Sequence, residues 1–198
     1  YLQGTLLTAL VSEVDQPALR NGVADAASSG LDAVRVEARL RTAEKETWFE
    51  FRLSLYSADG VARVLAVGRD MSVQHATEER LRHMATHDGL TELPNRLLLS
   101  DRIRMVIAQS RRSGQGFVVA TIGLDGFKKV NDGLGHPVGD EVLRVAAARL
   151  RKTLRDSDTL ARIGGDEFVA VLPGTHTEAQ IKLVTGRLLA TLQSPFEI

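Results

Sequence analysis

Residues 162–168 read Arg162-Ile163-Gly164-Gly165-Asp166-Glu167-Phe168, and this stretch decides how the surrounding chain folds. An apolar run from Thr159 to Ile163 precedes the two glycines, and a second run from Phe168 to Leu172 follows them. This pattern predicts a β-hairpin with a glycine turn. Two carboxylates come directly after the turn. Bare glycine backbone beside paired acids suits a site that brings phosphates and a cation close together.

The composition is that of a globular protein without nucleic-acid-binding character. Hydrophobic residues make up 43% of the 198 residues, charged residues make up 25%, and the formal net charge is zero. Neither half of the chain has the basic excess of a nucleic-acid binder, so we expect no nucleic-acid polymer as a partner. The absence of cysteine excludes disulfides and thiolate metal sites, and it fits a reducing, cytoplasmic location.

The ends of the chain indicate a piece of a longer protein. The sequence begins at Tyr1 without a methionine and stops at Phe196-Glu197-Ile198, in what reads as the start of a strand. No apolar run reaches the length of a membrane span, and no signal peptide is visible. A membrane tether elsewhere in the full-length protein stays compatible with these observations.

Residues 1–72 predict short helices followed by an antiparallel sheet. Apolar residues favour one helix near residues 6–11 and a second from Pro17 to about Ala27. Side chains then alternate between apolar and polar along three expected strands, around residues 34–40, 49–55 and 61–67. Asp59-Gly60 predicts the turn between the last two strands.

Three stretches of this region carry a family resemblance. Trp48-Phe49-Glu50, the Asp59-Gly60 turn and Val67-Gly68-Arg69-Asp70-Met71-Ser72 resemble the last half of a PAS sensor domain, which would cover residues 1–72. The alternative is an unrelated meander sheet. No histidine or cysteine in this region is placed like a haem or flavin ligand, so the sequence names no sensory cofactor.

Residues 73–86 predict a polar helix with one narrow apolar stripe. Val73, Thr77, Leu81 and Met84 recur at steps of four, four and three. A stripe this thin suits a seam between two helices rather than a globular core. The segment is similar to the dimeric signalling helix of PAS–GGDEF proteins, which implies a homodimer through residues 73–86. A solvated linker helix is the alternative.

Residues 87–198 predict an α/β domain. His87-Asp88-Gly89-Leu90-Thr91-Glu92-Leu93-Pro94-Asn95-Arg96 precedes a helix, and an apolar run over residues 117–124 predicts a central strand covered on both faces. Two helices, the hairpin and a last helix over residues 178–192 follow. The opening stretch and the hairpin motif resemble the GGDEF family of diguanylate cyclases, nearly residue for residue. The resemblance implies a sheet similar to nucleotide cyclase and polymerase palm domains, truncated at its C-terminus, and a pairing of Asp88 with Arg162.

The resemblance implies a reaction that condenses two GTP into cyclic di-GMP and two pyrophosphates. Asp166, Glu167 and Lys128 match the catalytic positions of the family, and Mg²⁺ (or Mn²⁺) is the implied cofactor. The implied metal ligands are Asp166, Glu167 and the backbone carbonyl of Leu124. The family places a further metal-binding aspartate at the position that Gly123 occupies here. We expect Asp125, which is retained, to point away from that position, and the cyclase to be weakened.

The resemblance also assigns nucleotide-binding residues. Asn131 and Asp140 match the guanine readers, and Gly164 and Gly165 contribute to the substrate site. An amide with a carboxylate suits guanine, because the carboxylate accepts from N1–H and N2–H while the amide serves the remaining edge. The residue pair of the product-binding inhibitory site is matched by Arg155 and Asp158. Each residue taken alone reads as a turn or cap residue.

Three hypotheses follow from these residues. The first is a diguanylate cyclase under PAS control, with activity weakened by Gly123. The second is a degenerate GGDEF domain that binds GTP or cyclic di-GMP and regulates an attached domain such as an EAL phosphodiesterase. In support, Gln193-Ser194-Pro195-Phe196 resembles the stretch found in GGDEF domains that are followed by an EAL domain. The third is a PAS dimerisation module that carries a vestigial domain. Turnover separates the first from the others, and nucleotide binding separates the second from the third.

Overall fold

The computed structural model describes residues 7–28, 33–41 and 45–197, and these form two compact units. The first unit spans Tyr1–Leu81 and the second Arg82–Ile198. The unit boundary falls inside helix α3, Ser72–Thr86, so this helix begins in one unit and ends in the other. None of the described helices has the length and apolar character needed to cross a membrane.

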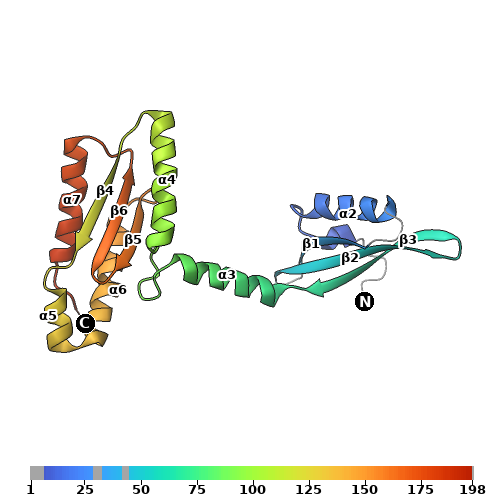
Figure 1. Ribbon diagram of the computed structural model, residues 1–198, viewed down its shortest axis with the longest axis horizontal. Coiled ribbons are helices and arrows are strands. Elements are labelled where there is room, and N and C mark those ends of the chain that lie inside the picture. The colour runs from blue at the N-terminus through green and yellow to red at the C-terminus, as the bar shows by residue number, and fades with distance from the viewer. Residues whose placement is uncertain (1–6, 29–32, 42–44, 198) are drawn as a thin grey trace. The chain divides into compact units, whose positions relative to one another are not determined.

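The first unit is an antiparallel sheet with helix α2 on one face (Figure 1). Its strands pair in the order β1-β2-β3, and its elements are α1 (Leu7–Leu10), α2 (Gln16–Ser28), β1 (Val34–Arg41), β2 (Glu46–Ala58) and β3 (Val61–Asp70). The three predicted strands are therefore confirmed. Leu19 of α2 packs with Val36 of β1 and Leu53 of β2 in one buried cluster. The first residues of the expected N-terminal helix lie outside the described residues.

A tight turn closes the β2–β3 hairpin as predicted. Asp59 has a φ of 52° and Gly60 a φ of 74°, both in the left-handed region. Two consecutive residues with positive φ form the turn that matches the twist of a two-stranded ribbon.

The second unit is a three-stranded antiparallel sheet between helices (Figure 1). Its elements are α4 (Arg96–Ser113), β4 (Phe117–Gly123), α5 (Phe127–Leu134), α6 (His136–Thr153), β5 (Thr159–Gly164), β6 (Glu167–Pro173) and α7 (Glu178–Gln193). The larger core cluster gathers Leu143 and Leu150 of α6 with Phe168 and Leu172 of β6 and Leu188 of α7. A mixed α and β fold with a glycine-turn hairpin is therefore confirmed.

The prediction that residues 117–124 form the central strand is wrong for the described sheet. The strand order is β4-β6-β5, so β6 lies in the middle and β4 at an edge. Five consecutive residues of β6, 168–172, are buried, whereas Val119 of β4 is 47% exposed. An apolar run can indicate that the faces of a strand are covered, but it does not indicate which strands lie beside it. In the described sheet, β4 pairs with β6 alone.

Helix α3 contains no buried residue, which fits its polar sequence. Val73 is 82% exposed, Leu81 59% and Met84 65%, so the predicted apolar stripe is open to solvent within the described chain. The helix is fastened at its end: the side-chain nitrogen Nδ2 of Asn95 donates to the Ala85 carbonyl at 2.8 Å. The backbone N–H of Asn95 donates to the Thr86 carbonyl at 2.9 Å.

Candidate active site

The hairpin turn depends on its two glycines and on one arginine. Gly164 has a φ of 146° and Gly165 a φ of 52°, which glycine adopts at little cost. The Arg162 guanidinium folds back over the turn, because Nε donates to the Gly165 carbonyl at 2.9 Å and Nη2 donates to it at 2.7 Å. Two hydrogen bonds from one side chain therefore support the turn.

The predicted pair of Asp88 and Arg162 is confirmed. Arg162 Nη1 donates to Asp88, at 2.9 Å from Oδ1 and 3.0 Å from Oδ2. The Thr91 hydroxyl donates to Oδ1 at 2.6 Å, and the Thr91 N–H donates to it at 2.9 Å. The backbone N–H of Arg162 also donates to the Pro94 carbonyl at 3.0 Å. The turn that ends helix α3 is thus bonded directly to the glycine hairpin.

These bonds fix the charge state of Asp88. Partial burial alone would raise its pKa, but hydrogen bonds from Thr91 and Arg162 outweigh burial and hold the pKa below its ordinary value. A carboxylate whose pKa is lower in the folded state contributes stability above its unfolded pKa, about 3.9. This contribution is lost as the pH falls through the folded pKa.

We therefore expect acid to unfold the chain partly through Asp88. Urea unfolding measured from pH 7 down to about pH 3 should show that Asp88→Asn removes part of the loss below about pH 4. Asp101→Asn, on an exposed position of α4, is the matched control and should follow the wild type. An unchanged acid profile for Asp88→Asn would contradict the assigned charge state.

The acidic pair lies beside Gly123. Glu167 is the first residue of β6, where it pairs in register with Gly123 of β4 and with Gly164 of β5. Glu167 is exposed and Asp166 half-buried. A Cβ built on Gly123 meets no atom within 4 Å. Because paired residues on neighbouring strands project from the same face, a carboxylate at position 123 would lie next to Glu167.

The residues present do not complete a site for two divalent ions. Among the described residues, no three acidic, histidine or cysteine side chains come together. Mg²⁺ takes oxygen ligands and is often held by one or two carboxylates with substrate phosphates. Asp166 and Glu167 could supply that number. The Leu124 carbonyl accepts a hydrogen bond from the Phe127 N–H at 3.2 Å, which engages one of its two lone pairs.

The expectation that Asp125 points away from position 123 stays a prediction, because Asp125 lies beyond the end of β4. Strand β4 ends at Gly123, and Gly123, Leu124 and Asp125 all line one cavity of about 690 Å³. The cavity lies among α5, α6 and α7, and its other walls are mainly apolar. None of the other predicted site residues lines it, so its size alone does not identify the active site.

The predicted guanine residues come from two neighbouring helices. Asn131 lies in α5 and Asp140 in α6, and both are half-buried. Lys128, in the first turn of α5, is exposed. Asn131 Oδ1 is buried and makes no hydrogen bond within the described part of the chain. With the acceptor oxygen buried, the donor nitrogen is the Asn131 amide atom left to contact a ligand.

Gly139 explains how the Asn131 amide is held, a role that no sequence pattern indicates. A Cβ at Gly139 would collide with Asn131 Oδ1, and it would lie 3.0 Å from Asn131 Cγ and 3.3 Å from Cζ of Phe127. Glycine inside a helix is unfavourable relative to alanine, by about 1 kcal/mol. The close approach of Asn131 is the physical reason for it here.

We expect Gly139→Ala to displace Asn131 and weaken GTP binding about fivefold, the effect of one lost hydrogen bond of about 1 kcal/mol. Calorimetric titration with GTP measures the change. Gly133→Ala in α5 is the matched control, because a Cβ there meets nothing within 4 Å. Equal GTP affinities for the two folded variants would show that the close contact does not position Asn131.

The predicted inhibitory-site residues form a tight turn after α6. Asp158 Oδ2 accepts the Arg155 N–H at 2.9 Å, and the Asp158 N–H donates to the Arg155 carbonyl at 3.1 Å. The Asp158 carboxylate therefore shapes its own turn, as the alternative interpretation of this residue predicts. Arg155 is exposed, and no partner of its guanidinium is found among the described residues.

Comparison with known proteins shows which family and which relatives the chain resembles. Residues 85–198 match the family described as "Diguanylate cyclase, GGDEF domain". The chain is 38% identical over 172 residues to diguanylate cyclase DgcP of Pseudomonas aeruginosa, covering 87% of this chain and 25% of that protein. It is 41% identical over 127 residues to the bifunctional diguanylate cyclase/cyclic di-GMP phosphodiesterase MucR of the same organism, covering 64% and 18%. The chain therefore spans a quarter or less of the length of these two relatives.

Solved structures show the same fold. The GGDEF domain of TpbB from Pseudomonas aeruginosa matches with a TM-score of 0.55 and 38% identity, over 57% of this chain and 65% of that one. The coiled coil and GGDEF domain of DgcB from Caulobacter crescentus, solved in complex with c-di-GMP, matches with a TM-score of 0.54 and 30% identity, over 59% and 61%.

Proposed function

Because the chain belongs to the GGDEF diguanylate cyclase family, we propose that it forms cyclic di-GMP from two GTP at a rate lowered by Gly123. In this reaction the 3′-hydroxyl of each GTP attacks the α-phosphorus of the other, and two pyrophosphates leave. The observation that carries the proposal is the register of the sheet, which sets Gly123 beside Glu167 at the end of an intact glycine hairpin.

The chain's own residues would bind and orient the nucleotides. Asn131 and Asp140 would read guanine, and Lys128 would approach the phosphates. The turn at Gly164 and Gly165 leaves room for phosphate, because it has no side chains. Positioning of this kind supplies much of the rate of phosphoryl transfer.

A divalent ion, Mg²⁺ or Mn²⁺, would be held by Asp166, Glu167 and the Leu124 carbonyl. When bound, such an ion neutralises phosphate charge. The ligand set is one carboxylate short of the family pattern, and this shortage is the reason for the low rate. The proposed inhibitory site at Arg155 and Asp158 would bind the product, with arginine contacting phosphate or the guanine edge.

Control would come from the N-terminal unit. We assign residues 1–72 to a partial PAS sensor domain, residues 73–86 to a signalling helix and residues 87–198 to the GGDEF domain. The solvent-exposed stripe on α3 supports a homodimer through this helix, because a row of exposed apolar side chains at helical spacing is buried when two helices pair. The full-length protein would be cytoplasmic or tethered, with an EAL domain as a possible neighbour.

Incubation of the full-length protein with GTP and Mg²⁺ or Mn²⁺, with cyclic di-GMP measured over time, tests the proposal. We expect slow product formation that is abolished when Asp166 and Glu167 are both replaced by their amides. Calorimetric binding of GTP or cyclic di-GMP without turnover would instead favour the degenerate, regulatory domain. Turnover as fast as that of a cyclase with all metal ligands would contradict the role assigned to Gly123.

A further inference from the structure

The only tryptophan of the chain lies where helix α3 begins. Trp48 belongs to β2 and pairs in register with Arg39 of β1. Its carbonyl accepts the N–H of Met71 at 2.8 Å, directly before α3. Met71 is 6% exposed, so its side chain is buried at the point where β3 ends and α3 begins. Trp48 is therefore bonded to the residue from which α3 leaves the sheet.

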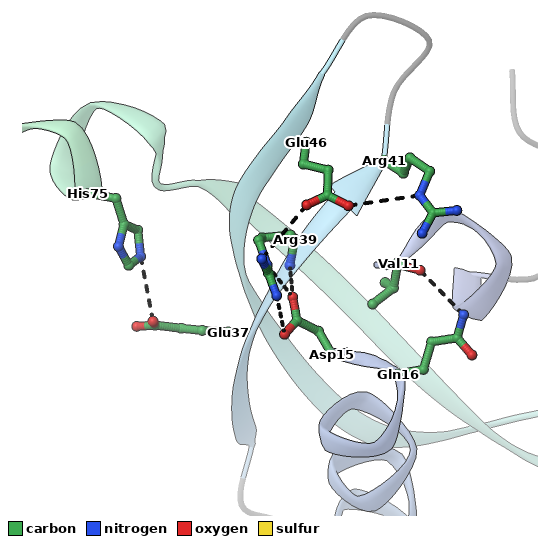
Figure 2. A network of polar contacts seen from close by, with 8 residues as sticks. All are labelled: Val11, Asp15, Gln16, Glu37, Arg39, Arg41, Glu46 and His75. Carbon is green, nitrogen blue, oxygen red and sulfur yellow. Dashed lines mark hydrogen bonds and ion pairs between the residues drawn. The ribbon is translucent and has the colours of Figure 1, made fainter. Parts of the chain in front are cut away.

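His75, in the first turn of α3, contacts the tryptophan ring. The ring centroids of Trp48 and His75 are 4.6 Å apart, and the ring planes differ by 21°. His75 Nε2 also lies 3.6 Å from Glu37 Oε2 on β1, as Figure 2 shows. The start of α3 is thus attached to two strands of the sheet by one side chain.

On the same tryptophan, Arg39 makes a second contact that leads to α2. The Arg39 guanidinium carbon lies 5.1 Å from the Trp48 ring centroid. Arg39 Nε donates to Asp15 Oδ2 at 2.8 Å, and the Arg39 backbone N–H donates to the same oxygen at 3.0 Å (Figure 2). The side-chain hydrogen bond from Arg39 lowers the pKa of Asp15. Asp15 directly precedes α2, so four side chains connect the start of α2 to the start of α3.

We propose that Asp15, Arg39, Trp48 and His75 form a relay, that is, a chain of side-chain contacts that sets the position of α3 on the sheet. Trp48 is the joint of this relay, because it contacts both Arg39 and His75. The signalling role of this relay rests on the proposed control of the cyclase by the N-terminal unit. A displacement at the start of α2 moves Asp15, and with it the Arg39 guanidinium that lies over the Trp48 ring. Because His75 stacks on the same ring, the displacement reaches the start of α3. The contact is one of ring packing and charge, so it responds to small displacements without unfolding the sheet.

The elements that pack against His75 carry charges of both signs. Glu37 faces it from β1, Glu50 of β2 is the register partner of Glu37, and Arg69 of β3 is the partner of Glu50. On α3 itself, Glu78 and Glu79 lie one turn further along, where side chains three and four residues apart are neighbours. Arg39 of β1, whose guanidinium carbon lies 5.1 Å from the Trp48 ring centroid, adds a further cation to this group. A protonated imidazole binds an indole face more tightly than a neutral one.

Fluorescence of the single tryptophan tests the relay without any nucleotide. An imidazolium in contact with indole quenches its emission, so emission from the full chain should fall as the pH is lowered from 8 to about 5.5, where histidine takes up its proton. We expect His75→Gln to abolish this fall, while His83→Gln, on the same helix, keeps it. Asp15→Asn should reduce the fall, while Glu13→Gln, two residues away, keeps it.

Two results would overturn the proposal. One is a pH-dependent fall in His75→Gln that equals the wild type, which would mean that His75 does not sit on Trp48. The other is an Asp15→Asn response identical to that of Glu13→Gln, which would break the link to α2. Circular dichroism of each variant confirms that the sheet is folded.

Turnover in the full-length protein tests whether the joint is used. His75→Gln and Asp15→Asn should change the rate of cyclic di-GMP formation in the same direction, and His83→Gln and Glu13→Gln should not. Equal rates in all these proteins would overturn the relay as a signal path. No turnover in any of them, with the fluorescence pattern intact, would contradict the proposed enzymatic function and leave the joint supported.

Discussion

Gly123→Asp should raise the rate of cyclic di-GMP formation about 10–100-fold. Loss of even an outer partner of a metal ligand typically lowers affinity or activity by about this factor, so return of a ligand should restore at least as much. The register places the new carboxylate beside Glu167, and a Cβ at position 123 meets no atom within 4 Å. The gain should come with tighter Mg²⁺ activation, measured as the metal concentration for half-maximal rate.

Gly186→Asp is the matched control for this experiment. Gly186 lies on an exposed position of α7, and a Cβ there also meets nothing within 4 Å. The same exchange at that position should leave the rate unchanged. If Gly123→Asp behaves like Gly186→Asp, the missing carboxylate is not what limits this chain.

Arg162→Ala should lower the free energy of unfolding by about 3 kcal/mol and abolish turnover. Only 11% of the Arg162 side chain and 22% of the Asp88 side chain are exposed. Removing one partner of a largely buried ion pair leaves the other without compensation and costs about 3–5 kcal/mol. The same substitution frees the Gly165 carbonyl, so the hairpin turn loses its side-chain support. Urea unfolding and the cyclase assay measure the two effects.

Arg144→Ala provides the comparison. Arg144 pairs with Glu141 at 2.9 Å, but both side chains are about half exposed. Exposed pairs contribute about 0–1 kcal/mol, so this variant should lose little stability and keep its activity. Equal losses for the two variants would show that burial of the Asp88–Arg162 pair is not what stabilises the hairpin.

The parts of the fold that are written in local patterns were predicted well. Alternation around Phe49 and Phe51 predicted β2, and the glycines at 164 and 165 predicted the hairpin, because periodicity and turn chemistry act within a few residues. The Asp88–Arg162 pair joins residues 74 positions apart, and only the family resemblance predicted it.

What the sequence missed depends on three-dimensional neighbours. Residues 117–124 read as a central strand, yet strand order is not encoded in the run itself. Nothing in the local sequence around Gly139 indicates its close contact with Asn131, which appears only when α5 and α6 pack together. The bonds from Arg162 to the Gly165 carbonyl likewise follow from the turn's shape rather than from any spacing.

The empty space around Gly123 also bears on how many mutations separate this chain from a complete set of metal ligands. Glycine and aspartate codons differ by one base when the glycine codon ends in a pyrimidine. Because a side chain at position 123 meets no neighbouring atom, such a change requires no compensating substitution in the sheet. A lineage carrying this chain could therefore lose and regain the carboxylate by single mutations, with fold stability placing little constraint on either step.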